Sequence, residues 1–227
     1  MSFIVAIDGP AGSGKGTVTK LVGQRLNLVN IDSGAAYRCI ALETIERKVK
    51  IEEKQKIIKM LDDIKIEFRI ENGENVIYLN NKNVGDRIRQ KDVTQIVSQI
   101  SSIKEVRFTL NDIFRNCANG KDIIMEGRDI GTCVFPNANV KIYLDASPEE
   151  RAKRRFKQNQ EKGIDMSYDE IIENIKKRDK NDMQKEIGAL KQAEDAIYID
   201  SSDMTIEQVV ERIVQLIDIE KIKIHKK

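Results

Sequence analysis

A glycine-rich segment near the start of the chain constrains the fold more than any other feature. It spans residues 9–17 with the sequence G-P-A-G-S-G-K-G-T, follows the apolar run 3–7 and precedes a helical pattern that begins near Lys15. Glycines let the backbone wrap closely round an anion with its N–H groups pointing inward, and the following helix adds the positive end of its dipole. The segment therefore predicts a strand, a phosphate-binding loop and a helix in succession.

Two side chains in this segment extend the prediction to a nucleotide site. Lys15 would place a cation on the outer phosphates, and the hydroxyl of Thr17 would reach a bound Mg²⁺. The general pattern G-x-x-x-x-G-K-[ST] is missed by one position because Gly16 follows the lysine, which is the form seen in nucleoside monophosphate kinases. The alternative, a glycine-rich turn without a ligand, is disfavoured by the lysine and the threonine. The residues expected to hold the nucleotide are Gly9, Pro10, Ala11, Gly12, Ser13, Gly14, Lys15, Gly16 and Thr17.

Apolar runs rich in β-branched residues alternate with helical patterns along the chain. They cover residues 3–7, 28–31, 123–125, 140–144 and 196–199. Runs of this kind, separated by helices, predict a parallel sheet that is covered on both faces. Each run ends in a small or acidic group, and ligands of open α/β sheets bind just outside the carboxyl ends of the strands. We therefore expect the chemically active residues to meet at one edge of the sheet.

One region interrupts this alternation. Residues 64–79 alternate apolar and polar side chains on both sides of Asn72-Gly73, which predicts an antiparallel hairpin with its turn at that dipeptide. A further turn is expected at residues 80–83, followed by a helical segment to about residue 117. We interpret residues 36–117 as an insertion between the second and third strands of the parallel sheet.

The composition excludes several classes of function. The net charge is +2 and only 5% of the residues are aromatic, which argues against nucleic-acid binding. Cys39, Cys117 and Cys133 lack C-x-x-C spacing, so neither a zinc site nor a disulfide framework is indicated, and we expect Cys39 and Cys133 to be small buried side chains. No apolar run approaches the ~20 residues that span a bilayer, and no signal-peptide pattern opens the chain. We expect a cytoplasmic protein without membrane partners.

Three further segments have the residue types of a second binding site. They are D-S-G-A-A-Y-R at 32–38, E-G-R-D-I-G-T at 126–132 and R-D-K-N-D-M-Q-K at 178–185. Each segment also has a simpler explanation. In the first, Ser33 could be the N-cap of a helix. In the second, Arg128 and Asp129 could form an ion pair at the start of a helix, and the third could be a solvated helix face.

Taken together, these segments closely resemble bacterial cytidylate kinases, and the resemblance covers nearly the whole chain. The matching motifs are I-D-G-P-A-G-S-G-K-G-T, D-S-G-A-A-Y-R, G-R-D-I-G-T-x-V-F-P, K-I-Y-L-D-A-S-P-E-E-R-A-x-R-R and R-D-x-x-D. The resemblance implies a three-layer α/β P-loop fold with five parallel strands in the order 2-3-1-4-5. It also implies one kinase domain with a core at 1–35, 118–150 and 190–227, an acceptor-binding insert at about 36–117 and a short lid at about 151–189.

The family's reaction transfers a phosphoryl group from ATP, with Mg²⁺, to CMP or dCMP. The residues that match its acceptor site are Ser33, Tyr37, Arg38, Ser98, Arg107, Arg128, Asp129, Arg178, Asp182 and Lys185, and Lys15, Arg128 and Arg178 would be catalytic.

The chemistry of these side chains agrees with those roles. Asp129 would accept from the cytosine amino group, while Arg107 and Ser98 would donate to the ring acceptors. Arginine forks at Arg38 and Arg128 suit the acceptor phosphate. Asp182, with Arg178, would meet the ribose hydroxyls.

The lid and two departures from the family pattern complete the expectation. Arg151, Arg154 and Arg155 resemble lid arginines that close over ATP, and we expect Arg154 to lie nearest the nucleotide, in a helix with Ser147 as N-cap and Pro148 as first residue. The family often has arginine where this chain has Lys185, and aspartate where it has Glu126. Lysine keeps the charge but loses the bidentate fork, and glutamate moves its carboxylate outward by one methylene.

Two other functions stay open on the sequence. The first is a kinase of the same fold acting on UMP, AMP or a non-nucleotide acceptor. The second is a non-catalytic module that changes shape on binding ATP and recruits a partner. For the kinase that the resemblance implies, we expect small-molecule substrates and a monomer.

Overall fold

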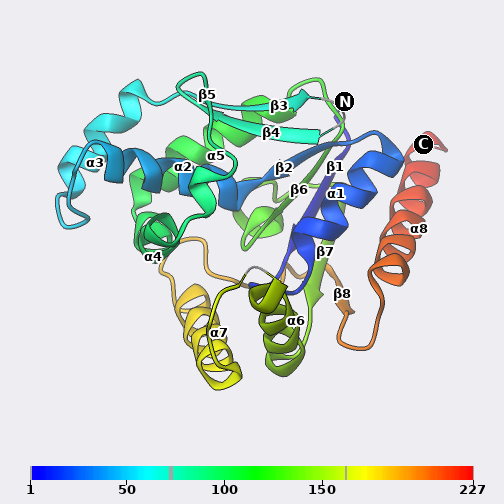
Figure 1. The fold of residues 1–227 in the computed structure, drawn as a ribbon. Helices are drawn as coiled ribbons and strands as arrows, with labels where there is room; N and C mark the ends of the chain where they lie inside the picture. Colours follow the sequence, from blue (N-terminus) through cyan, green and yellow to red (C-terminus); the bar gives the residue numbers. More distant parts are fainter. Residues whose placement is uncertain (1, 72–73, 162, 227) are drawn as a thin grey trace. The chain divides into compact units, whose positions relative to one another are not determined.

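A computed structural model describes residues 2–71, 74–161 and 163–226 (Figure 1). The chain forms two compact units: the sheet unit, residues 3–29 and 122–227, and the insert unit, residues 2 and 30–121. The described strands are β1 (Ile4–Asp8), β2 (Val29–Asp32), β3 (Ile66–Glu71), β4 (Glu74–Leu79), β5 (Lys82–Asn83), β6 (Ile123–Gly127), β7 (Val140–Asp145) and β8 (Ile197–Asp200). The described α-helices are α1 (Lys15–Leu26), α2 (Ser33–Glu46), α3 (Lys54–Met60), α4 (Lys91–Ile100), α5 (Lys104–Ala118), α6 (Pro148–Glu161), α7 (Tyr168–Met183) and α8 (Ile206–His225).

The main sheet is parallel and has five strands in the order β2-β6-β1-β7-β8. Numbered by their succession among the parallel strands, this order is 2-3-1-4-5, so the predicted topology is confirmed. The register aligns the carboxyl ends of neighbouring strands: Asp8 lies opposite Gly127, and Asp145 lies opposite Asp200. The strand ends that the sequence analysis singled out in the sheet unit therefore do lie along one edge.

Two helices cover one face of this sheet. The apolar side chains of β1, β7 and β8 that point to this face form one buried cluster with Val18 and Val22 of α1 and with Ile213 and Ile217 of α8. Side chains of one face alternate along a strand, which explains why Val5 and Ile7 belong to the cluster while Ala6 does not. This packing holds the end of β1 and the start of α1 in place, and the glycine-rich loop connects these two ends.

The insert unit contains a small antiparallel sheet in the order β3-β4-β5. The predicted hairpin is confirmed by the pairing of Ile66 with Leu79 and of Phe68 with Ile77, while its predicted turn at residues 72–73 lies outside the described residues. The next turn is also present where it was expected. Asn80 and Asn81 both have positive φ, 49° and 64°, as the two-residue turns of right-twisted hairpins require.

The helical segment expected up to residue 117 is two helices, α4 and α5. The hydroxyls of Ser101 and Ser102 both donate to the carbonyl oxygen of Ser98, at 2.9 and 3.0 Å. The Ser98 carbonyl oxygen thus has side-chain donors in addition to any backbone donor, and such bonds compete with the regular helical pattern. The helix α4 ends at Ile100, directly before these two serines.

The helix caps agree with the sequence in one case and differ in another. Ser147 caps α6, since its Oγ accepts from the Glu150 amide at 3.1 Å, and Pro148 is the first helical residue. The cap of α2, however, is Asp32 rather than Ser33: Asp32 Oδ1 accepts from the Ala35 amide at 2.9 Å. Asp32 has extended backbone angles at the strand end, whereas Ser33 is already helical, so only Asp32 has the geometry of a cap.

Candidate functional site

The glycine-rich loop has a backbone that only glycine permits at critical points. Gly9 has φ 151°, and a Cβ there would lie 2.0 Å from the carbonyl oxygen of Leu144 in β7. Gly14 caps α1 with φ 94°, in the left-handed region that other residues avoid. The backbone of the loop therefore lies directly against β7 where it leaves β1, and it turns into α1 at Gly14. This is the arrangement that binds phosphate.

Lys15 folds back over this loop. Its Nζ donates to the carbonyl oxygen of Pro10 at 2.6 Å and to Ser13 Oγ at 3.2 Å, and the residue is only 4% exposed. Burial, followed by the repulsion of Arg128, lowers the pKa of Lys15 to about 7, while Glu126 and Asp8 act in the opposite direction. The ammonium is thus held by weak neutral acceptors at the loop, and the negative charge of a phosphate group there would favour its protonated form.

Thr17 and Glu126 supply the oxygen donors that a magnesium ion prefers. Thr17 is exposed on the first turn of α1. The Glu126 carboxylate lies beside Gly16, where a Cβ would come within 2.9 Å of Oε1. Glycine after the lysine therefore makes room for the longer glutamate side chain. In the described part of the chain no group of three or more His, Cys, Asp or Glu side chains could hold a metal alone. This donor set fits Mg²⁺ bound jointly with nucleotide phosphates.

Asp8 connects the start of the loop to the segment after β6. It ends β1, is 5% exposed, and its Oδ1 and Oδ2 accept from the amides of Ile130 and Gly131, both at 2.8 Å. Burial raises the pKa of Asp8 to about 6, although these two amide donors lower it. The amides belong to a π-helical turn, Ile130–Val134, which directly follows Arg128 and Asp129.

Charged side chains from α7 and from the residues that follow β6 and α7 meet at one carboxylate. Asp182 Oδ2 accepts from Arg128 Nε at 3.0 Å, Oδ1 accepts from Lys185 Nζ at 2.9 Å, and Arg178 Nε lies 4.0 Å away. Burial by itself would raise the pKa of Asp182, but Arg128, Lys185 and Arg178 hold it below its usual range. We call these four residues the Asp182 cluster. It unites sequence-predicted site residues from two distant segments, with an excess of positive charge suited to a phosphate.

The three arginines that the resemblance assigns to a lid have three different environments. Arg151 is 3% exposed and donates to the carbonyl oxygens of Ala146 (2.8 Å) and Ala11 (3.1 Å) and to Asp179 Oδ2 (2.7 Å). Arg154 donates to the carbonyl oxygen of Ser201 at 2.7 Å, and its Nη1 lies 3.9 Å from a Cβ placed on Gly14. Arg155 is exposed. Arg151 thus bonds the backbone of the loop and joins α6 to α7, while Arg154 lies beside the loop.

The insert unit brings together other sequence-predicted residues. The Arg107 guanidinium lies over the Tyr37 ring at 5.5 Å and donates to the carbonyl oxygen of Ser101 at 3.1 Å. Arg38 donates to the carbonyl oxygen of Ile88 and to Thr94 Oγ1, at 3.2 and 2.7 Å. Tyr37 and Arg38 are consecutive residues of α2, so this helix supplies two of the predicted acceptor-site side chains.

Ser33 and Ser98 complete the predicted residues of the insert unit. Ser33 is buried at the start of α2. Ser98 is half-buried on α4, where its carbonyl oxygen accepts from two serines.

Sequence reasoning missed three residues that organise the sheet unit. Asp8 was noted only as a strand end, and neither Asp179 nor the internal role of Arg151 was foreseen. The sole signal was an acid directly before the first glycine of the loop. For the other two there was none, because the pairing of Arg151 with Asp179 joins residues 28 positions apart. One cysteine was also predicted wrongly: Cys39 is buried as expected, but Cys133, within the π-helical turn, is exposed.

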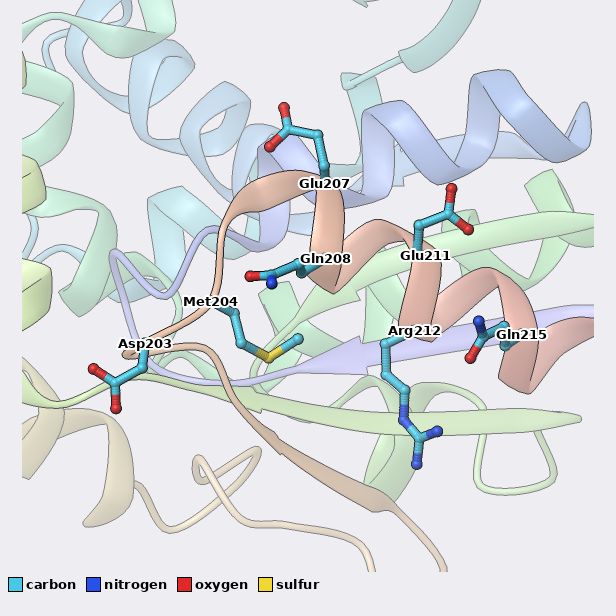
Figure 2. Close-up of a pocket in the computed structure, with 7 residues that line it drawn as sticks. All are labelled: Asp203, Met204, Glu207, Gln208, Glu211, Arg212 and Gln215. Atoms are coloured by element: carbon cyan, nitrogen blue, oxygen red, sulfur yellow. The ribbon is translucent and has the colours of Figure 1, made fainter.

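Other features of the surface do not compete with this site. A depression of about 490 Å³ lies along the start of α8 (Figure 2). Its lining residues fall between Asp203 and Gln215, and none of them was predicted as a site residue. Among the described helices, none has the length and apolarity needed to cross a membrane.

Comparison with known proteins gives a consistent result. A family model described as cytidylate kinase matches residues 5–219. A protein named cytidylate kinase from Caldicellulosiruptor saccharolyticus is 45% identical over 212 residues, which cover 93% of this chain and 94% of that protein. Another of the same name from Fusobacterium nucleatum is 43% identical over 222 residues, covering 98% and 99%.

A solved structure shows likeness of fold alone. It is an uncharacterized protein from Eubacterium ventriosum, 14% identical, with a TM-score of 0.51 and coverage of 96% of this chain and 99% of that chain.

Proposed function

The chain belongs to the cytidylate kinase family, and on this premise we propose that it converts CMP and dCMP to CDP and dCDP with ATP and Mg²⁺. It is an enzyme of the kinase class. One observation supports the proposal most directly. A phosphate loop with a buried lysine and an arginine-rich cluster round Asp182 belong to the same compact unit. A donor phosphate and an acceptor phosphate each need such a group of cations.

The donor half of the reaction is assigned to the loop. The backbone amides of residues 9–17 would bind the ATP phosphates, with Lys15 turning from the carbonyl oxygen of Pro10 to the outer phosphates. Arg154, beside Gly14, would contact the nucleotide. Thr17 and Glu126 would hold Mg²⁺, which supplies charge neutralisation to the phosphate oxygens when bound.

The acceptor phosphate is assigned to cations of the Asp182 cluster. Arg128, Arg178 and Lys185 are oriented by one carboxylate, so their charges are already gathered before a phosphate arrives. An oxygen of the acceptor phosphate attacks the γ-phosphorus of ATP, and ADP leaves. No general base is needed because that oxygen is ionised near pH 7. Asp182 and Arg178 would also meet the ribose hydroxyls.

Cytosine recognition is assigned to Asp129, Arg107 and Ser98. A carboxylate at Asp129 would accept from the N4 amino group of cytosine, whereas uracil presents at that position a carbonyl oxygen, which has no hydrogen to donate. A site that hydrogen-bonds its substrate can reject the wrong base by about 10⁴. The resemblance assigns the remaining acceptor contacts to Ser33, Tyr37 and Arg38.

The wider setting follows from these assignments. The resemblance supports a monomer that acts on small molecules. ATP and CMP are cytoplasmic metabolites, so we place the reaction in the cytoplasm. Neither nucleic acid nor a membrane is part of the proposed reaction.

An acceptor panel tests the proposal. ADP release from ATP·Mg²⁺ is measured in parallel with CMP, dCMP, UMP, AMP and no acceptor. Turnover with CMP and dCMP alone is expected. Efficient turnover of UMP or AMP would contradict the cytosine assignment but keep the kinase, and ATP binding without turnover of any acceptor would indicate a non-catalytic module.

The Asp129→Ala variant tests the base contact separately. We expect its preference for CMP over UMP to fall by about tenfold or more, since a charge-assisted hydrogen bond is lost. Unchanged selectivity would overturn the assignment of Asp129.

A further inference from the structure

The carboxylate of Asp8 bonds the π-helical turn to the strand that leads into the phosphate loop. Asp8 is the last residue of β1 and directly precedes Gly9. Its two oxygens each accept one hydrogen bond of 2.8 Å, from consecutive amides at Ile130 and Gly131. Because two adjacent amides bond to the two oxygens of one carboxylate, they fix the orientation of the turn relative to β1 as well as its distance from β1.

The residues held in this way lie next to those assigned to the acceptor. Arg128 and Asp129 stand between the end of β6 and the bonded amides, and Asp8 lies opposite Gly127 in the sheet. The segment 128–129 is therefore attached to β1 on both sides: by the strand register before it and by the Asp8 carboxylate after it. Asp8 and both amides are buried, so water does not replace a lost bond.

We propose that Asp8 is a positioning residue for the acceptor, whose carboxylate holds Arg128 and Asp129 in register with the phosphate loop. Acceptor affinity and base selectivity then depend on a buried side chain that is not among those assigned to either substrate. This inference rests on the proposed function, because it takes Arg128 and Asp129 to bind CMP. ATP affinity should depend on Asp8 far less, since the loop has its own support in Gly9 against β7 and in Arg151.

The test uses Asp8→Asn in the full-length chain, with Asp122→Asn as a matched control. Asparagine has the same shape, but its amide group would face one of the two backbone N–H groups, so one bond is lost. Asp122 Oδ1 also accepts a backbone amide at 2.8 Å, from Phe3, but it does so at the opposite end of β1 and β6. Both changes thus remove one negatively charged acceptor of a backbone amide beside an end of β1.

The readout is the KM of each substrate together with kcat. In Asp8→Asn we expect the KM for CMP to rise by about tenfold and the preference for CMP over UMP to fall, while the KM for ATP stays within about twofold. Asp122→Asn should leave all of these values unchanged. A merely structural role would lower the amount of folded enzyme and kcat, without separating the two substrates.

Two results would overturn the proposal: an unchanged KM for CMP, or equal rises in the KM for CMP and for ATP. If Asp8→Asn does not fold, Asp8→Glu replaces it. The longer side chain keeps the charge, but its extra methylene moves the two oxygens away from the positions in which they accept from Ile130 and Gly131. It should also raise the KM for CMP selectively, and an unchanged KM for CMP in this variant would again refute the role.

Asp129→Ala separates this inference from the proposed function. If Asp129→Ala changes base selectivity and Asp8→Asn does not, the positioning role is wrong while the acceptor assignment stands. If Asp129→Ala leaves base selectivity unchanged, the acceptor assignment has failed, and a loss of selectivity in Asp8→Asn is then no longer expected.

Discussion

The phosphate loop and the Asp182 cluster are both assigned to phosphate groups, but they are built in opposite ways. In the loop, Lys15 bonds to Pro10 and Ser13, which are five and two positions away. In the cluster, Arg128 bonds to Asp182, which is 54 positions away. The geometry of the loop is set by the backbone conformations of its own glycines. The cluster exists only because β6 and α7 come together.

This difference affects how each region responds to change. A site made from nearby residues loses its chemistry when one side chain is removed, but it retains its shape. A site made from distant segments depends on the contacts that hold those segments, which lie outside the site itself. Arg151 and Asp8 are such contacts, since they connect the loop to α7 and to the turn after Arg128.

The largest effect is expected from removing the cation of the local site. Lys15→Ala should lower kcat with every acceptor by about 10³-fold, because a preorganised charge on the transferred group is lost. The fold should remain, since the glycines that shape the loop are unchanged. Steady-state ADP release and thermal unfolding measure the two properties. Lys20→Ala, exposed on the same helix, is the control. A rate within tenfold of the unmodified enzyme would refute the role of Lys15.

The next effect addresses the connection between the two regions. Arg151→Met should destabilise the protein by about 3–5 kcal/mol, because the buried carboxylate of Asp179 loses its partner. Asp179 Oδ1 already has no hydrogen-bond partner among the described atoms. Arg155→Met removes an exposed arginine from the same helix and should change stability by less than about 0.5 kcal/mol. Urea unfolding gives both values.

A second substitution shows whether the unpaired charge is the cause. Adding Asp179→Asn to Arg151→Met removes the buried charge, so the double variant should be more stable than Arg151→Met alone. If the double variant is instead less stable by the full cost of a second substitution, the two side chains do not act as a pair.

The smallest effect concerns the pH dependence of stability through Asp8. Its pKa is about 6 in the folded chain against an ordinary 3.8, and the titratable groups around it are Asp129, Lys15 and Tyr143. Between these two pH values the folded state binds more protons than the unfolded state. The contribution of Asp8 to the free energy of unfolding is therefore fully present below pH 4 and is lost as the pH rises to 6, by about 3 kcal/mol at most.

Unfolding free energies between pH 4 and 7 for the unmodified protein and for Asp8→Asn test this sign. The difference between the two should fall with rising pH and level off above pH 6. A difference that rises with pH would mean that Asp8 is ionised more readily in the folded chain than in the unfolded chain.

Local features of this chain were accessible from the sequence. The loop, the start of α1 at Lys15, the strands at 4–8 and 140–145 and the Asn80–Asn81 turn each depend on conformations that a few adjacent residues dictate. The resemblance added the strand order and the acceptor residues, and the strand order is confirmed. The hierarchy among Arg151, Arg154 and Arg155 was not accessible, because spacing along one helix does not say which side chain has buried partners elsewhere.

The amino-acid sequence thus determined the phosphate loop and the alternation of strands and helices, since backbone preferences and apolar periodicity act over a few residues. Folding decided that Asp182 would gather Arg128 and Lys185, that Arg151 would bond the backbone of the loop and that Asp8 would hold the turn at Ile130. Burial and charge pairing decide such contacts. They act only between groups that packing has brought together, and packing depends on the whole chain.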